Sequence, residues 1–285
     1  MFLDVPAGAP LHQLLTRATQ RLHTISPTAS LDAHILLAHV LGWERIKLFV
    51  EHTTILSTEQ ITAFDRLVQR RASGEPVAYL TGQRAFFGLD LLVDPRVLIP
   101  RPETELLVER ALQLVAPSTQ PLVIADIGTG SGALAVALAV HLLSAQIYAT
   151  DISADALAVA LSNCIRHHVA QQITLLQGNL CEPLPEPVDL LLSNPPYTVW
   201  DAIDWQVRTY EPRLALDGGR EGLEVYRRLI PQAVAWLKPG ASILLEIDPR
   251  QTTELITLAE TIFPTAEITV TEDLAGWPRV LAIRT

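Results

Sequence analysis

The feature that most constrains the fold is an alternation of short apolar runs and helical segments that begins at residue 122. LVIAD reads as a buried strand, GALAVALAVHLL as the helix after it and IYATD as the next strand. Ser153 caps a further helix, and then come ITLLQG, DLLLS, a helix over residues 222–237 and ASILLEI. Such alternation predicts a parallel sheet with helices on both faces. Ligands bind beyond the carboxyl ends of the strands in such sheets, so the residues there are the candidates for a functional site.

The residues before this alternation differ from it in pattern. Between residues 11 and 74 the apolar side chains recur with helical spacing, and Ser57 with Gln60 predicts a capping box. The stretch 77–99 is rich in β-branched, aromatic and turn residues, which predicts a β-hairpin or an extended linker. We therefore expect three regions: a helical domain over 1–75, a β-hairpin linker over 76–99 and an α/β domain over 100–285.

Composition bears on the partners and the compartment. The chain carries 21 basic and 31 acidic side chains, and this net charge of −10 suits a nucleic-acid backbone poorly. Cys164 and Cys181 have no metal-like spacing, so we expect buried free thiols, no metal site and a reducing compartment. No signal peptide is recognisable, and the longest apolar stretch is shorter than the about 20 residues that cross a bilayer. We expect a cytoplasmic monomer that binds neither nucleic acid nor membrane.

A glycine-rich loop follows the strand at 122–126. Gly128, Gly130 and Gly132 allow a tight turn and a close approach of the backbone to a ligand. The helix after the loop offers free N–H groups and the positive end of its dipole. Asp151 ends the next strand, 21 residues after Gly130, and its carboxylate can accept two hydrogen bonds from a ribose diol. The loop and the acid together predict a nucleotide-like ligand.

Two points stay open at this stage. The spacing Gly128-x-Gly130-x-x-Ala133 also fits the alanine variant of the dinucleotide fingerprint, so a nicotinamide dehydrogenase is a competing interpretation. Asn179 follows the third strand, and its amide oxygen suits the amino group of adenine. An ordinary Gly-Asn turn explains Asn179 nearly as well.

The fourth strand ends in Asn194-Pro195-Pro196-Tyr197. Two prolines can neither continue a strand ladder nor lie in a helix interior, so this turn needs another explanation. Asn194 carries a neutral acceptor oxygen, and Pro195 keeps its backbone carbonyl at a fixed φ. Pro196 stiffens the turn, and Tyr197 offers a flat apolar face. Together they form a receptor for a planar amino group, whose nitrogen they aim at an electrophile.

The chemistry of such a nitrogen explains this design. The lone pair of an amide or aromatic amine is delocalised, so the nitrogen is a weak nucleophile that needs a strong electrophile. Alignment and acceptors for the developing positive charge then matter more than a strong base. With the glycine loop and Asp151, the turn at Asn194 predicts methylation of a planar nitrogen by S-adenosyl-L-methionine.

The motifs DIGTGSG and SNPPY resemble class I methyltransferases that modify planar nitrogens. Residues 75–105, 207–227 and 273–284 are similar to the release-factor glutamine methyltransferases, the HemK/PrmC family, and the resemblance covers nearly the whole chain. It implies methylation of the side-chain amide nitrogen (N5) of the glutamine in the Gly-Gly-Gln motif of class 1 peptide chain release factors, the proteins of translation termination. An adenine-N6 methyltransferase acting on nucleic acid is the alternative, and the net charge counts against it.

The resemblance also implies a fold and a site. The fold is the α/β, Rossmann-like class I methyltransferase fold, a doubly wound seven-stranded sheet with a reversed last strand, joined to a small all-α N-terminal domain that helps to bind the release factor. The implied cofactor residues are Gly128, Thr129, Gly130, Ser131, Gly132, Asp151, Asn179, Leu180 and Asn194. The implied glutamine pocket comprises Asn194, Pro195, Pro196 and Tyr197, of which Asn194, Pro195 and Tyr197 are the catalytic residues. The family usually carries an acid where Asn179 stands.

Overall fold

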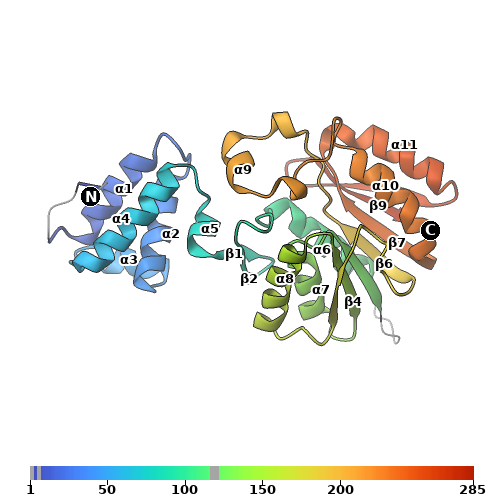
Figure 1. The fold of residues 1–285 in the computed structure, drawn as a ribbon, viewed down its shortest axis with the longest axis horizontal. Coiled ribbons are helices and arrows are strands. Elements are labelled where there is room, and N and C mark those ends of the chain that lie inside the picture. The colour runs from blue at the N-terminus through green and yellow to red at the C-terminus, as the bar shows by residue number, and fades with distance from the viewer. Residues whose placement is uncertain (1–2, 5–7, 116–121) are drawn as a thin grey trace. The chain divides into compact units, whose positions relative to one another are not determined.

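The computed structural model describes residues 3–4, 8–115 and 122–285. The chain divides into two compact units, Met1–Gly82 and Gln83–Thr285 (Figure 1). The division lies within the stretch that the sequence predicts as a linker. Each unit has a hydrophobic core of its own, which agrees with the expected separation of a helical part from an α/β part.

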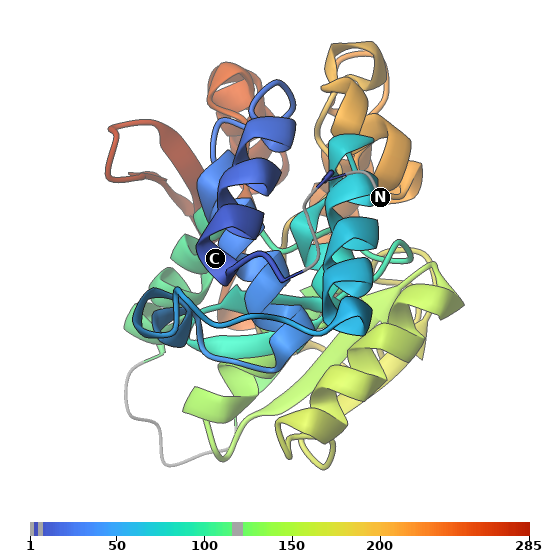
Figure 2. The same cartoon turned by 90° about the vertical axis from the view of Figure 1, so that its left-hand side faces the viewer.

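The N-terminal unit is helical, as predicted. Its helices are α1 (Leu11–Leu22), α2 (Ala29–Leu41), α3 (Arg45–Val50), α4 (Thr58–Ala72) and α5 (Val77–Thr81). Figures 1 and 2 show α1, α2 and α4 packed side by side. The expected capping box at Ser57 and Gln60 is present with both of its hydrogen bonds, so α4 begins where the sequence predicts it.

The prediction of a β-hairpin over the whole linker is wrong at its start. Residues Val77–Thr81 form helix α5, because Pro76 at the N-cap has an extended conformation and the helix ends at Gly82 in the left-handed region. The hairpin itself is shorter and consists of β1 (Gln83–Phe86) and β2 (Leu89–Leu92) in antiparallel pairing. The chain then continues without regular structure to the 3-10 helix η1 (Pro102–Thr104).

The second unit contains the predicted seven-stranded sheet. Its strands are β3 (Val123–Ile127), β4 (Gln146–Asp151), β5 (Ile173–Gln177), β6 (Val188–Ser193), β7 (Leu237–Glu246), β8 (Glu267–Glu272) and β9 (Pro278–Arg284). They lie in the order β5-β4-β3-β6-β7-β9-β8. Pairing from β5 through β7 is parallel, whereas β9 runs antiparallel to both of its neighbours. The prediction of a reversed last strand is confirmed.

Helices cover both faces of the sheet, as Figure 1 shows. On one face α6 (Glu105–Leu114), α7 (Ala133–His141) and α8 (Ala154–Arg166) share a core with Ile124 of β3. On the other face α10 (Glu224–Ala233) and α11 (Thr252–Ile262) share a core with Ala125. Adjacent residues of one strand thus face opposite layers, which is why these strands read as continuous apolar runs.

Short elements complete the second unit. The segment between β6 and α10 contains η2 (Trp200–Ala202), α9 (Trp205–Tyr210) and η3 (Arg213–Ala215), and the remaining 3-10 helices are η4 (Val234–Trp236) and η5 (Pro249–Gln251). Cys164 and Cys181 are buried free thiols, as expected. Over the described residues, no helix has both the length and the apolar character needed to cross a bilayer.

Candidate functional site

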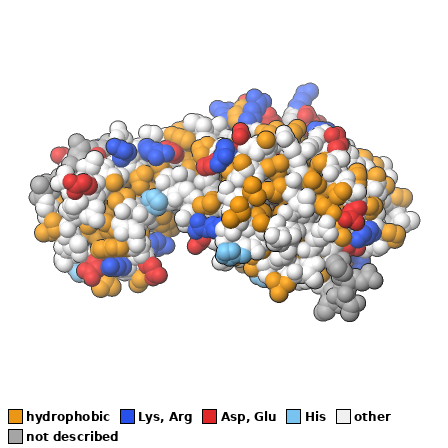
Figure 3. Space-filling model, turned by 60° about the horizontal axis from the view of Figure 1, so that its bottom comes forward, with side chains coloured by type: hydrophobic (Ala, Val, Ile, Leu, Met, Phe, Trp, Pro, Cys, Tyr) orange, Lys and Arg blue, Asp and Glu red, His pale blue; other side chains and the backbone are white. Residues whose placement is uncertain are grey.

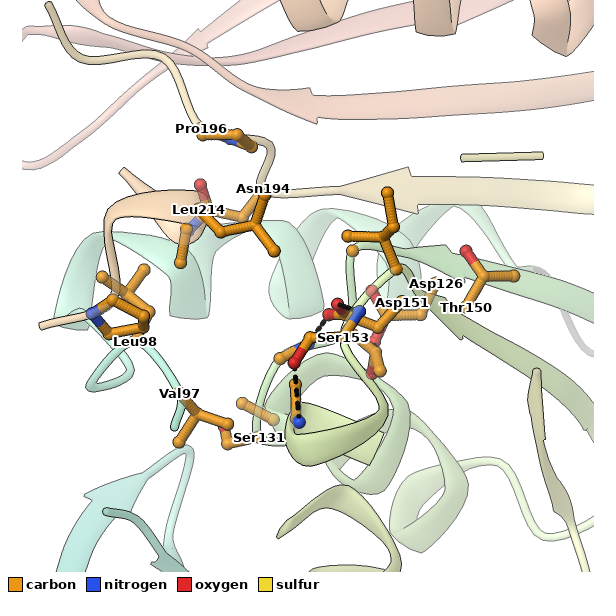
Figure 4. Close-up of a pocket in the computed structure, with 18 of the residues that line it drawn as sticks. Val97, Leu98, Asp126, Ser131, Thr150, Asp151, Ser153, Asn194, Pro196 and Leu214 are labelled. Carbon is orange, nitrogen blue, oxygen red and sulfur yellow. Dashed lines mark hydrogen bonds between the residues drawn. The ribbon is translucent and has the colours of Figure 1, made fainter. Parts of the chain in front are cut away.

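A cavity of about 490 Å³ lies at the carboxyl ends of β3, β4, β5 and β6. Figure 4 shows Asp126, Asp151 and Ser153 grouped on one side of it and Asn194 with Pro196 on another. Of the predicted cofactor residues, the following line it: Gly128, Thr129, Gly130, Ser131, Asp151, Asn179, Leu180 and Asn194. The fold therefore brings together residues that follow four different strands in the sequence.

Gly132 has a different place from the other loop glycines. It is the N-cap of α7 with φ of 80°, and a Cβ atom there would come within 3.2 Å of the Cβ of Ala160 in α8. Gly132 is not a lining residue of the cavity in the described structure. Because Gly132 has no side chain, α7 and α8 can approach each other closely. Gly132 therefore affects the loop through the packing of these helices and not through contact with the cavity.

The glycine loop is tied to the strand next to it. Gly130 has φ of 56°, and its N–H donates to Oδ2 of Asp151 at 2.9 Å. The N–H of Ser153 donates to the other carboxylate oxygen, Oδ1, also at 2.9 Å. The pKa of Asp151 is raised, because the effect of burial exceeds the opposing effect of these backbone donors. Asp151 is thereby fixed in orientation, and its carboxylate keeps lone pairs for a ligand hydroxyl.

Asp126 is a residue of this cavity that the sequence analysis placed only in a strand. Its Oδ2 accepts hydrogen bonds from the Thr129 hydroxyl at 2.6 Å and from the N–H of Ala135 at 3.2 Å. Its Oδ1 is buried and has no hydrogen-bond partner among the described residues. Burial raises the pKa of Asp126 to about 6. The signal in the sequence is an acid inside an apolar strand directly before the glycine loop.

The side chain of Asn179 is already engaged within the protein. Its Oδ1 accepts a hydrogen bond from Nη2 of Arg228 at 2.6 Å, and its Nδ2 donates to Glu182 at 2.8 Å. Leu180 follows with φ of 55°, and its carbonyl accepts from the Thr150 hydroxyl at 3.0 Å. This end of the cavity is therefore a fixed turn, in which the amide oxygen of Asn179 has one acceptor position already occupied.

A second cavity of about 290 Å³ adjoins the turn at Asn194-Pro195-Pro196-Tyr197. All four of these residues line it, together with Arg101 and others. Asn194 and Pro196 line both this cavity and the larger one. The turn that the sequence singled out is therefore the wall shared by two cavities.

The side chains at the two ends of this turn form hydrogen bonds with residues outside the turn. Nδ2 of Asn194 donates to the Thr104 hydroxyl at 3.0 Å, and the Tyr197 hydroxyl donates to Oε1 of Glu246 at 3.0 Å. Burial, followed by the charge of Glu246, raises the pKa of Tyr197 well above its usual value. Tyr197 therefore keeps its proton at neutral pH and presents its ring as a neutral surface.

The backbone of the turn rests on a glycine-containing loop after η3. The N–H of Thr198 donates to the carbonyl of Leu216, and the N–H of Gly218 donates back to the carbonyl of Thr198. A Cβ atom at Gly218 would come within 2.7 Å of the Pro196 carbonyl oxygen, and one at Gly222 would overlap the carbonyl of Tyr197. Only glycine leaves room for the turn at these two positions.

The chain is similar to known proteins along most of its length. Residues 13–82 match the family model described as the PrmC N-terminal domain, and residues 103–209 match the methyltransferase small domain. Relatives named release factor glutamine methyltransferase include one from Rhodopirellula baltica, 40% identical over 91% of this chain and 90% of its own. A relative of the same name from Moorella thermoacetica is 40% identical over 94% of this chain and 96% of its own.

Solved structures agree on the fold. The crystal structure of a methyltransferase from Pyrococcus furiosus covers 76% of this chain and 96% of its own, with a TM-score of 0.53 and 19% identity. At that identity the likeness concerns the fold alone.

Proposed function

This chain belongs to the release factor glutamine methyltransferase family, and we propose that its two adjoining cavities hold the methyl donor and the acceptor glutamine. It is an enzyme that methylates a release factor glutamine. We assign the larger cavity to S-adenosyl-L-methionine and the smaller one to the Gly-Gly-Gln glutamine of a class 1 peptide chain release factor. The observation that carries this assignment is the wall shared by the two cavities at Asn194 and Pro196.

The residues of the larger cavity suit that donor. When bound, S-adenosyl-L-methionine supplies an electrophilic methyl group on a positively charged sulfur, and it also carries an ammonium group. The buried, unpartnered Oδ1 of Asp126 is an anionic acceptor that complements such a cation. Asp151, held by Gly130 and Ser153, suits the two hydroxyls of a ribose.

The turn between the cavities suits an amide nitrogen as acceptor. Because Nδ2 of Asn194 donates to Thr104, its Oδ1 is left to accept a hydrogen bond from the glutamine NH2 group. The carbonyl of Pro195 supplies a second acceptor, and both stabilise the positive charge that develops on nitrogen. The hydroxyl of Tyr197 is engaged with Glu246, so we assign to Tyr197 a contact through its ring and no role as a base.

The rest of the molecule supports a protein substrate better than nucleic acid. The N-terminal unit matches the PrmC N-terminal domain, and we assign to it a part in binding the release factor. On the face in Figure 3, basic and acidic side chains lie close to one another at several points, and the net charge is −10. A surface of this kind is a poor match for a polyanion.

Mass spectrometry of a purified class 1 release factor, incubated with this protein and S-adenosyl-L-methionine, tests the proposal. We expect a gain of one methyl group on the Gly-Gly-Gln glutamine. The matched control is a release factor in which that glutamine is replaced, which should gain none. DNA and RNA in parallel reactions provide the alternative acceptors: methylation of either, without methylation of the release factor, would overturn the assignment.

A further inference from the structure

The smaller cavity, which we assign to the acceptor glutamine, is formed mainly by residues outside the Asn-Pro-Pro-Tyr turn. Four of its thirteen lining residues belong to that turn, two to residues 98–101 and seven to residues 198–216. We call these last two stretches the 98–101 segment and the 198–216 segment. Leu98 and Ala215, one from each segment, also line the larger cavity. The two segments therefore supply most of the acceptor cavity and part of the wall between the two cavities.

Each segment is fixed by hydrogen bonds of its own. In the 98–101 segment, the carbonyl of Pro100 accepts from Nε of Arg84 in β1 at 3.2 Å. The 198–216 segment is closed at its base, where the N–H of Thr198 donates to the carbonyl of Leu216 at 3.1 Å. The shape of the cavity between the segments then depends on how the middle of the second segment is joined to the first.

Glu211, at the end of α9, joins the two segments. Its Oε2 accepts a hydrogen bond from the N–H of Ile99 at 3.1 Å, and its Oε1 accepts from Nη2 of Arg101 at 2.5 Å. The side chain of Glu211 is 2% exposed, and that of Arg101 is 32% exposed. The N–H of Glu211 donates to the carbonyl of Val207, and both Val207 and Arg101 line the acceptor cavity. This buried carboxylate thus connects two residues of the cavity wall that are distant in sequence.

The two contacts of Glu211 require a carboxylate. Both of its oxygens meet donors, and a buried charge is costly unless it is paired and hydrogen-bonded in this way. A glutamine amide has one acceptor oxygen and one NH2 group, so it could accept from Ile99 or from Arg101 but not from both. Two hydrogen bonds to one planar group also restrict its rotation, so the contact sets the orientation of the segments as well as their separation.

We propose that Glu211 is a positioning residue that, through Arg101 and Ile99, holds the two segments together and so shapes the cavity around the acceptor glutamine. This inference rests on the proposed function, because it takes the assignment of the cavities from there. In the described structure Glu211 lines neither cavity, so it acts through the segments and not by contact with the donor or the glutamine. A small misplacement of reacting atoms lowers the rate of a positioned reaction strongly.

The first test is Glu211→Gln, which keeps the shape of the side chain and breaks one of its two hydrogen bonds. We expect kcat on the release factor to fall by about tenfold or more, because the glutamine is held in a less favourable position. The KM for the release factor should stay within about threefold, since its contacts outside the cavity remain. The Kd for S-adenosyl-L-methionine, measured by calorimetry, should also stay within about threefold, since the glycine loop and Asp151 are unchanged.

Asp201→Asn is the matched control for that variant. Asp201 pairs with Arg208 at 3.8 Å inside the 198–216 segment, and its side chain is 94% exposed. The same change from acid to amide removes an exposed ion pair that does not connect the two segments, so we expect kcat and KM within about twofold of wild type. A loss of kcat equal to that of Glu211→Gln would overturn the proposal, since loss of any charge in this segment would then suffice.

Arg101→Met removes the charged partner of Glu211, and the double variant Arg101→Met/Glu211→Gln completes a double-mutant cycle. We expect Arg101→Met to lower kcat by about tenfold, and the double variant to lose no more than about twofold beyond the larger single loss, because both changes break one contact. Losses that multiply would show that Arg101 acts on the substrate by itself and would overturn the positioning role. If Glu211→Gln does not fold, Arg101→Met decides alone, and a wild-type kcat in it overturns the proposal.

The outcomes also separate this proposal from the one on which it rests. An unmodified release factor in the wild-type reaction would remove the proposed function and this inference with it. An active wild type with unchanged kcat in Glu211→Gln would overturn the positioning role alone. A loss of affinity for S-adenosyl-L-methionine as large as the loss of kcat would overturn it too, since it would indicate a general disruption of the domain.

Discussion

The glycine loop and the Asn-Pro-Pro-Tyr turn both border the larger cavity, but they are held in different ways. Gly130 bonds to Asp151 of the next strand along the chain, 21 residues away. Asn194 is held by Thr104, 90 residues before it, and Tyr197 by Glu246, 49 residues after it. The loop is thus supported by its immediate neighbours, whereas the turn depends on distant segments. We expect changes in the loop to affect donor binding and changes around the turn to affect turnover.

The largest expected effect is that of Asn194→Ala, which tests the role of the turn in turnover. The variant loses the proposed acceptor oxygen, so we expect turnover to fall by at least ~100-fold, as loss of transition-state positioning should cause. The Kd for S-adenosyl-L-methionine should stay within about tenfold, because the loop and Asp151 remain. Single-turnover kinetics and calorimetry measure the two quantities. Unchanged turnover would contradict the role proposed for Asn194. A loss of donor affinity larger than the loss of turnover would contradict the expectation that the loop affects donor binding and the turn affects turnover.

Gly222→Ala tests whether the turn depends on its distant supports. The residue has φ of 73°, and a Cβ atom there would overlap the carbonyl of Tyr197. We expect the free energy of unfolding to fall by about 2–3 kcal/mol, from the strained φ and the overlap together. Urea unfolding measures this quantity.

Gly276→Ala is the matched control for that variant. Gly276 has φ of 80°, but a Cβ atom there would meet no heavy atom within 4 Å. Only the backbone term remains, so we expect a loss of about 1 kcal/mol and unchanged turnover. Equal losses in the two variants would indicate that the contact between Gly222 and the turn contributes nothing.

Asp151→Ala tests the other side of the comparison. The carboxylate orients the loop through Gly130, and we assign to it the ribose hydroxyls. We expect the Kd for S-adenosyl-L-methionine to rise by about tenfold or more, because a single hydrogen bond to a charged group contributes about 1.5–3 kcal/mol. Turnover at saturating donor should change by less than about threefold. Calorimetry on the variant checks the first value, and equal donor affinity would remove the ribose assignment.

The contrast between local and distant support also explains what could be predicted from the sequence. The parallel sheet and the Ser57 capping box were predicted from periodicity and short spacings, whereas the reversed last strand was implied by the resemblance to the methyltransferase family; these predictions are confirmed. Helix α5 was missed because a single turn after Pro76 is too short to show helical periodicity. A short element of this kind gives a local signal no stronger than that of a linker.

The supports of the turn were missed for a different reason. Thr104 follows an ordinary helix start, and Glu246 ends an apolar strand, so neither residue type nor spacing connects them with Asn194. Only the order of strands brings β7 beside β6 and makes Glu246 a neighbour of the turn. Asp126 is an intermediate case: an acid in a buried strand is visible in the sequence, but its unpartnered oxygen is not.

The smallest effect on donor affinity should come from substitution of Asn179, the predicted cofactor residue least available for a direct contact with the donor. Its Oδ1 accepts from Arg228, and its Nδ2 donates to Glu182, so the side chain is satisfied within the protein. We therefore expect Asn179→Ala to change the Kd for S-adenosyl-L-methionine by less than about threefold, well below the effect of Asp151→Ala. Asn179→Asp, which supplies the acid that the resemblance implies at this position, should retain the Arg228 contact as an ion pair and also stay within about threefold. A tenfold loss in the alanine variant alone would mean that the amide oxygen turns to the donor on binding. The loop side of the site would then change conformation when the donor binds. In that case the contrast between a donor site held by local contacts and an acceptor site held by distant segments would no longer hold.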